Sequence, residues 1–130
     1  MDISKLNTVT TSEQGKWLDI LDGDGVKTGI RIKVVGIDSK KFKSESQKLA
    51  KYLERQREEK NKDYDGVEYK TISMAVAITV DWENIEEDGK VLEFDKETGE
   101  RVYTNAPIIT EQVLRYAKDR NNFLSEKQTG

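Results

Sequence analysis

The stretch that decides the fold is MAVAITVDW, residues 74–82, an apolar run that ends in an aspartate and a tryptophan. Its β-branched residues favour a strand, but its apolar positions also recur at the spacing of a helix. The longer run from Glu68 to Trp82 exceeds the length of a typical strand. We therefore predict a helix over this run, with a strand over residues 72–80 as the alternative.

Upstream of this run, alternating side chains predict a β-hairpin. Its first strand covers Lys16 to Leu21, and the turn Asp22-Gly23-Asp24-Gly25 leads into a second strand from Val26 to Ile37. Glycines supply the positive φ angles that a tight turn needs. Every other residue from Ile30 to Val34 is apolar, which gives the second strand one apolar and one charged face. A two-stranded ribbon is marginally stable alone, so a helix or a neighbouring subunit must cover the apolar face.

A long charged helix is predicted from about Lys40 to Lys60. Asp38-Ser39 precedes it and offers a side-chain oxygen to the first backbone amides of the helix. The tail from Glu54 to Lys62 is almost wholly charged, so we expect it to be solvated and to lead into a loop over Asn61 to Gly66. The apolar stripe of this helix is narrow and consists of Phe42, Ser46, Leu49, Ala50 and Leu53.

The last third of the chain predicts a turn over Glu86–Gly89 and a small second hairpin. The strands of that hairpin are Val91–Asp95 and Arg101–Thr104, and Glu97-Thr98-Gly99 is its predicted turn. A final helix follows, with Thr104-Asn105 as its cap and Pro107 in its first turn, where a missing N–H donor is tolerated. The apolar stripe of this helix consists of Ile109, Val113, Tyr116, Ala117 and Phe123 or Leu124.

Together these elements predict an α+β fold with an N-terminal β-hairpin, a mainly α-helical region, a small second hairpin and a C-terminal helix. The 130 residues suit a single domain, 1–130. Residues 1–15 are predicted to be a polar N-terminal arm, either mobile or a weak strand, and residues 125–130 a frayed tail. Apolar residues make up 35% and charged residues 36%, which predicts a thin core. We also expect another protein to cover part of the apolar surface.

The composition argues against several kinds of chemistry. Cysteine and histidine are both missing, which removes thiolate metal sites and the commonest general base. A net charge of -3 argues against a nucleic-acid surface, because glutamates interrupt or follow the one local basic patch, Lys40, Lys41, Lys43, Lys48 and Lys51. No apolar stretch approaches the ~20 residues that cross a bilayer, and the start of the chain is not typical of a signal peptide. We predict no catalytic residue, no metal, no cofactor, no nucleic-acid or membrane partner, and a cytosolic protein.

The polar clusters of this sequence are better explained as surface features than as catalytic or metal sites. Asp22 to Gly25 offers alternate carboxylates for calcium, but Val26 stands where the next oxygen ligand is needed, so a plain turn is predicted. The serines have no histidine to activate them. The acidic cluster predicts a solvated helix exit or, second, a docking surface for a basic partner; its members are Asp81, Glu83, Glu86, Glu87 and Asp88.

Large aromatic side chains leave two interpretations open. They dominate burial in a small domain, and they also anchor protein interfaces. For Trp17 and Trp82 a core position is the favoured interpretation, and an interface is the alternative. Our candidate protein-binding residues lie on the predicted helices and at the tryptophan: Phe42, Leu49, Leu53, Trp82, Val113, Tyr116 and Phe123.

Two segments of the second half, MAVAITVDWENIEEDGKVLEF and ITEQVLRYAKDRNNFL, resemble the tail assembly chaperones of long-tailed bacteriophages. In that family a helix ends in a Trp, an Asp-Gly turn follows, a short segment contains a Phe, and the last helix finishes near an Asn-Phe pair. The resemblance extends upstream through GIRIKVVGIDSKKF to Trp17, so it covers most of the chain. The longer segment from Asp95 to Asn105 departs from the family pattern.

The resemblance implies a function in protein contacts. Tail assembly chaperones bind the tape-measure protein, keep its apolar helices soluble and help recruit tail-tube subunits, with possible homo-oligomers. It also implies a location in the host cytoplasm during assembly and absence from the mature virion. The main alternative is a structural tail or head-tail connector component that stays in the virion. A third hypothesis is a host-takeover or regulatory binding module that contacts a nucleic-acid enzyme.

Overall fold

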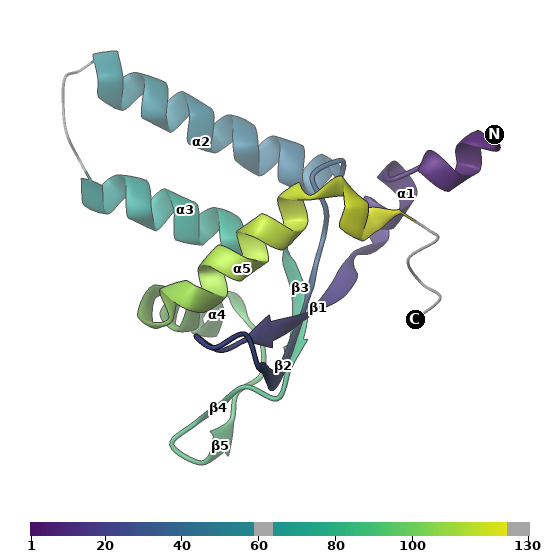
Figure 1. Ribbon diagram of the computed structural model, residues 1–130. Coiled ribbons are helices and arrows are strands. Elements are labelled where there is room, and N and C mark those ends of the chain that lie inside the picture. The colour runs from purple at the N-terminus through teal and green to yellow at the C-terminus, as the bar shows by residue number, and fades with distance from the viewer. Residues whose placement is uncertain (59–63, 125–130) are drawn as a thin grey trace.

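The computed structural model describes residues 1–58 and 64–124 and confirms the α+β fold (Figure 1). A three-stranded antiparallel sheet has the order β1-β2-β3, with β1 at Lys16–Leu21, β2 at Lys27–Val34 and β3 at Thr79–Glu83. The predicted N-terminal hairpin is therefore correct. Its turn is held by the Asp22 carboxylate, which accepts hydrogen bonds from the backbone amides of Asp24 and Val26 at 2.8 and 3.0 Å.

The decisive stretch contains both a helix and a strand. Helix α3 runs over Tyr64–Ile78, and β3 begins at the next residue, so the prediction of helix up to Trp82 is wrong from Thr79 onward. The Thr79 hydroxyl bonds back to the carbonyl of Ala75 at 2.8 Å, and β3 pairs with β2 through the register Trp82–Ile32. The chain leaves the helix here because a neighbouring strand is available to pair with it.

The long charged helix is confirmed as α2, Lys40–Glu58. The Ser39 hydroxyl accepts the Phe42 amide at 3.1 Å, which confirms the predicted N-cap. The predicted stripe is shifted, however, because Ser46 and Ala50 are exposed, and the less exposed positions are Phe42, Glu45, Leu49, Tyr52 and Gln56. Helices α2 and α3 lie side by side and project beyond the sheet (Figure 1). Residues 64–66 begin α3 and are not a loop, and the rest of that predicted loop lies outside the described residues.

The small second hairpin exists at a different place from the one predicted. Strands β4 (Glu86–Glu87) and β5 (Lys90–Val91) pair around Asp88-Gly89, inside the predicted turn region. Residues 96–105, which were predicted to contain the turn and second strand, form helix α4 (Lys96–Asn105). The Asp95 carboxylate caps this helix by accepting the Thr98 amide at 2.8 Å. A single side-chain cap is enough to start a helix where Thr98-Gly99 had indicated a turn.

The final helix, α5, runs over Pro107–Lys118 with proline in its first turn, as predicted. Its predicted cap is wrong, because Ala106 occupies that position and makes no side-chain bond. Helix α5 covers the inner face of the sheet, and the side-chain amide of Gln112 bonds both the N–H and the C=O of Leu21 at 2.8 Å. The helix is thereby fixed to the end of β1.

The N-terminal arm forms two short helices and no strand. These are the 3₁₀ helix η1 (Ile3–Leu6) and helix α1 (Val9–Gln14). Ser12 is fully buried, so the inner part of the arm packs on the body of the protein. The predicted frayed tail, residues 125–130, lies outside the described residues.

The core lies between the inner face of the sheet and the helices. It contains side chains of β1, β2, α3 and α5, including Ile20, Ile32, Ile78 and Val113, each 1% exposed or less. The outer face of the sheet is charged: Arg31 pairs with Glu83 at 2.8 Å and lies over the Trp17 ring at 5.0 Å. Among the described helices none is long and apolar enough to span a bilayer.

Candidate protein-binding cleft

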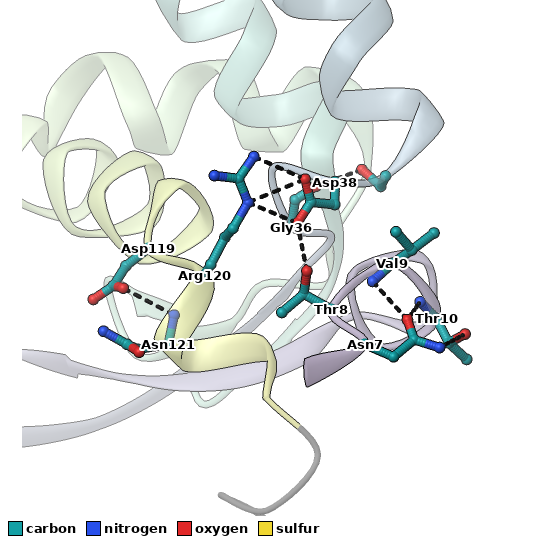
Figure 2. Close-up of polar contacts among 10 residues, drawn as sticks. Asn7, Thr8, Val9, Thr10, Gly36, Asp38, Asp119, Arg120 and Asn121 are labelled. Atoms are coloured by element: carbon teal, nitrogen blue, oxygen red, sulfur yellow. Dashed lines mark hydrogen bonds and ion pairs between the residues drawn. The ribbon is translucent and has the colours of Figure 1, made fainter. Parts of the chain in front are cut away.

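The closing motif of the chain, residues 119–124, forms a structural joint. The Asp38 carboxylate accepts three charged hydrogen bonds from Arg120, from Nε to Oδ2 at 2.9 Å and to Oδ1 at 3.2 Å, and from Nη2 to Oδ1 at 3.0 Å. It also accepts the Thr8 hydroxyl at 2.6 Å (Figure 2). The bonds from Arg120, and then the one from Thr8, lower the pKa of Asp38, so this group is a carboxylate at neutral pH. The joint connects the N-terminal segment, the turn after β2, and the C-terminal 3₁₀ helix η2, Arg120–Phe123.

Phe123 fills the centre of this joint. Its ring is fully buried, and it meets the Tyr116 ring edge-on at a centroid distance of 5.7 Å. A Cβ atom on Gly36 would lie 2.9 Å from two ring carbons of Phe123, so only glycine fits there. Asn122 donates to the carbonyl of Tyr116 at 3.0 Å. The Asn-Phe pair of the motif therefore has a structural task in this chain.

An open cleft of about 380 Å³ lies between α2, α3 and the segment that begins α4. Val76 and Ala77 of α3 contribute apolar lining, and the aromatic lining comes from Tyr69 and Phe94. Tyr69 is 55% exposed, which leaves a large aromatic surface without cover among the described residues. Charged and hydroxyl groups complete the cleft: Lys41, Glu45, Ser73, Lys96 and Glu100.

Trp82 holds one wall of this cleft from behind. Its ring is only 5% exposed and meets the Phe94 ring edge-on at 5.0 Å. The indole N–H donates to the carbonyl of Leu92 at 2.8 Å, which fixes the segment between β5 and α4. On the other side, a Cβ on Gly99 would approach Phe94 to 2.9 Å, so the glycine lets α4 lie close to the ring. The aromatic wall is therefore rigidly placed.

A buried chain of hydroxyl groups connects the elements that carry the cleft. The hydroxyls of Thr79 and Tyr103 are 2.7 Å apart, and Thr110 donates to the carbonyl of Tyr103 at 2.7 Å. Burial raises the pKa of Tyr103 above its ordinary value, so its hydroxyl stays protonated. With the bond from Thr79 to the carbonyl of Ala75, these contacts link α3, α4 and α5 to β3.

The seven candidate residues from the sequence are not gathered in one place. Phe42, Trp82, Val113 and Phe123 are buried in the core of this chain. Leu49 and Tyr116 are half-buried, and the Tyr116 hydroxyl donates to the carbonyl of Trp17 at 3.3 Å. Leu53, at 39% exposed, is the most accessible of the seven. None of the seven lines the cleft, and their role in protein binding stays a prediction.

The residues that line the cleft were not selected from the sequence. They come from three separate segments, and spacing within one segment does not reveal which of its side chains meet the others. Val76 and Ala77 belong to the apolar run, where Val76 is itself a buried core residue and Ala77 is half-buried among core positions. The best available signal was Tyr69, an aromatic residue among charged neighbours.

The described residues contain no group of three or more carboxylates, the type of cluster that could hold a metal ion in a chain without His or Cys. No curated protein and no solved structure was found to match this chain. The family model of the YdaY prophage protein, in contrast, matches residues 37–129. This range includes α2 to η2 and every residue that lines the cleft. Since the match covers well over half of the sequence, the chain belongs to the YdaY prophage protein family and is phage-derived.

Proposed function

We propose that this protein is a non-catalytic tail assembly chaperone, which binds the tape-measure protein and helps recruit tail-tube subunits. The observation that carries the proposal is the open cleft with an apolar lining and the exposed ring of Tyr69. The membership of the chain in a prophage protein family and its resemblance to tail assembly chaperones also support this proposal. The resembling segments also supply Trp82 and Phe94, which build one wall of the cleft.

In this proposal the cleft captures an apolar side chain from one face of a client helix. Burying a side chain such as leucine contributes about 1.5–3 kcal/mol, which is too little for tight binding by one site. Many copies along a long client would raise the total affinity, because each bound copy increases the local concentration for the next. Weak individual contacts let tail-tube subunits displace the chaperone as the tube grows.

No catalytic residue, metal or cofactor takes part in this proposal. In this proposal the protein acts in the host cytoplasm, and its partners are the tape-measure protein, tail-tube subunits and further copies of itself. It leaves the particle before assembly ends, so purified virions should lack it.

Co-expression with the tape-measure protein of the same prophage tests the proposal. We expect a soluble complex with the natural chain and much less complex with Tyr69→Ser, which removes the exposed ring at the cleft. Val26→Ser is the matched control, because Val26 is 59% exposed and lies in the β1–β2 connection. If both proteins are soluble and no complex forms, the proposal is wrong.

Mass spectrometry of purified virions separates the chaperone from a structural tail or connector component. A chaperone is absent from the particle, whereas a component is present in stoichiometric amount.

A further inference from the structure

Helix α2 is strongly basic in an acidic protein. It carries seven Lys and Arg residues against three Glu residues, a net charge of +4, while the whole chain has a net charge of -3. The remainder of the chain therefore has a net charge of -7. All seven basic residues of α2 are exposed: Lys40, Lys41, Lys43, Lys48, Lys51, Arg55 and Arg57.

Three of these cations follow one line along the helix and begin at the cleft. Lys41, Lys48 and Arg55 recur every seven residues, which places them on one stripe of α2. Lys41 lines the cleft itself. We call these three residues the basic stripe.

Acidic groups nearby do not cancel the basic stripe. The Glu45 side chain is only 16% exposed and lies 3.6 Å from the Lys48 ammonium, so its charge is already partly matched. Glu100 of α4 also lines the cleft, but it follows Lys96 by one turn on the same side of that helix, so the two opposite charges offset each other. The charge that remains open along α2 is positive.

We propose that the cleft and the basic stripe together bind an amphipathic helix with carboxylates beside its apolar face. This inference rests on the proposed function and names the chemistry of the client segment. An apolar side chain of the client enters the cleft between Tyr69 and Phe94, and Asp or Glu residues spaced seven apart pair with Lys41, Lys48 and Arg55. The apolar lining and the interleaved glutamates of α2 fit a protein helix better than a continuous run of phosphates.

Two synthetic helical peptides with identical apolar positions test the proposal directly. One carries Glu and the other Lys at the positions that flank the apolar face. One exposed charge pair contributes about 0.2–1 kcal/mol, so the three cations together should favour the Glu peptide by about tenfold in Kd at low salt. The preference should shrink between 50 mM and 500 mM NaCl, because salt screens exposed charges. Fluorescence anisotropy of labelled peptides measures both effects.

Charge reversal on the basic stripe provides the matched variant. Lys41→Glu with Lys48→Glu should weaken binding of the Glu peptide about tenfold and strengthen binding of the Lys peptide, because each exposed pair changes from attraction to repulsion. Lys27→Glu with Lys90→Glu makes the same charge change at exposed positions outside α2 and the cleft, and should keep the natural preference. Circular dichroism checks that both variants are folded.

Equal affinity of the natural chain for the two peptides overturns the inference. Competition by duplex DNA is a second outcome that overturns the inference. If the DNA displaces the Glu peptide from the natural chain and binds the Lys41→Glu, Lys48→Glu variant much more weakly, α2 is a nucleic-acid surface. A tape-measure complex that forms equally well with this variant also overturns the inference but leaves the proposed function standing. The opposite combination is also informative. If the natural chain prefers the Glu peptide but does not bind a soluble tape-measure protein, the proposed function is wrong and the specificity for an acidic helix stands.

Discussion

Gly36 is a residue at which one added methyl group should be costly. A Cβ there would lie 2.5 Å from the Ser12 hydroxyl oxygen and 2.9 Å from the Phe123 ring. We expect Gly36→Ala to lower the free energy of unfolding by about 1–3 kcal/mol, the usual cost of overpacking a filled core. Gly23→Ala is the control, because nothing lies within 4 Å of its added Cβ. Urea denaturation of the two variants measures the difference, and equal midpoints would show that the joint is loosely packed.

Asp38 should make stability depend on pH. Its side chain is 12% exposed and bonds Arg120 and Thr8, so Asp38→Asn should lower the free energy of unfolding by about 1–2 kcal/mol at pH 7. The pKa of Asp38 is lowered in the folded state, so the unfolded state binds more protons between the two pKa values. The advantage of the natural chain is therefore complete above about pH 4, near the unfolded pKa. It is lost as the pH falls through the folded pKa.

Denaturation of Asp38→Asn and the natural chain at several pH values between 2 and 7 checks this expectation. Asp24→Asn makes the same charge change in the exposed β1–β2 turn and serves as the control. A difference between Asp38→Asn and the natural chain that stays constant down to pH 2 would contradict the role of the Asp38 carboxylate.

At the scale of elements, Thr79 joins α3, β3 and α4. Thr79→Val keeps the shape of the side chain and removes the hydroxyl that faces Tyr103, leaving the buried Tyr103 hydroxyl without this partner. We expect a loss of about 1–3 kcal/mol. Tyr103→Phe removes the other hydroxyl, so the double variant should lose about 1 kcal/mol less than the sum of the single variants. Thermal and urea unfolding of all four proteins provide the cycle, and simple additivity would count against the bond.

Patterns within short segments correctly predicted the elements whose structure is determined by neighbouring residues in the sequence. The alternation in β2, the Ser39 cap of α2 and the proline of α5 are features of short segments, and the structure confirms each of them. The switch at Thr79 could not be predicted in this way, since β3 exists only because β2, about 50 residues earlier, offers it an edge. Helix α4 was missed because Thr98-Gly99 is typical of a turn. In the structure Gly99 is needed for the close approach of Phe94.

The candidate cleft was even less accessible to prediction. The sequence pointed to apolar stripes as contacts, but the core of this chain already uses Phe42 and Val113. Which aromatic side chains remain outside depends on how three segments meet, as with Tyr69 and Phe94. The basic character of α2 was visible from the sequence, whereas its position beside an apolar cleft was not.

At the scale of the whole molecule, the N-terminal segment should contribute to the stability of the fold mainly through residues 8–13. Residues 8–13 bond the Asp38 carboxylate and the backbone amides of Gly36 and Lys40. Each bond contributes about 1 kcal/mol, so we expect removal of residues 2–14 to lower the free energy of unfolding by about 2–4 kcal/mol. Removal of residues 2–6, which contain no buried side chain, should change it by less than about 0.5 kcal/mol. Equal denaturation midpoints for the two truncated proteins would contradict this division.

The joint at Asp38 also sets when the chain can complete its fold during synthesis. Arg120 follows Asp38 by 82 positions, and ribosomes add about 5–20 residues per second, so roughly 4–16 s separate the two ends of this contact. Phe123 emerges later still, and until then the space above Gly36 stays unfilled. The nascent chain must therefore hold a half-built sheet, with Ile32 and Val34 uncovered by α5, for roughly a hundred thousand times longer, or more, than the ~1–10 μs that a hairpin needs to form. Slower translation between Asp38 and Arg120 should therefore lengthen the time for which this apolar face of the sheet stays exposed.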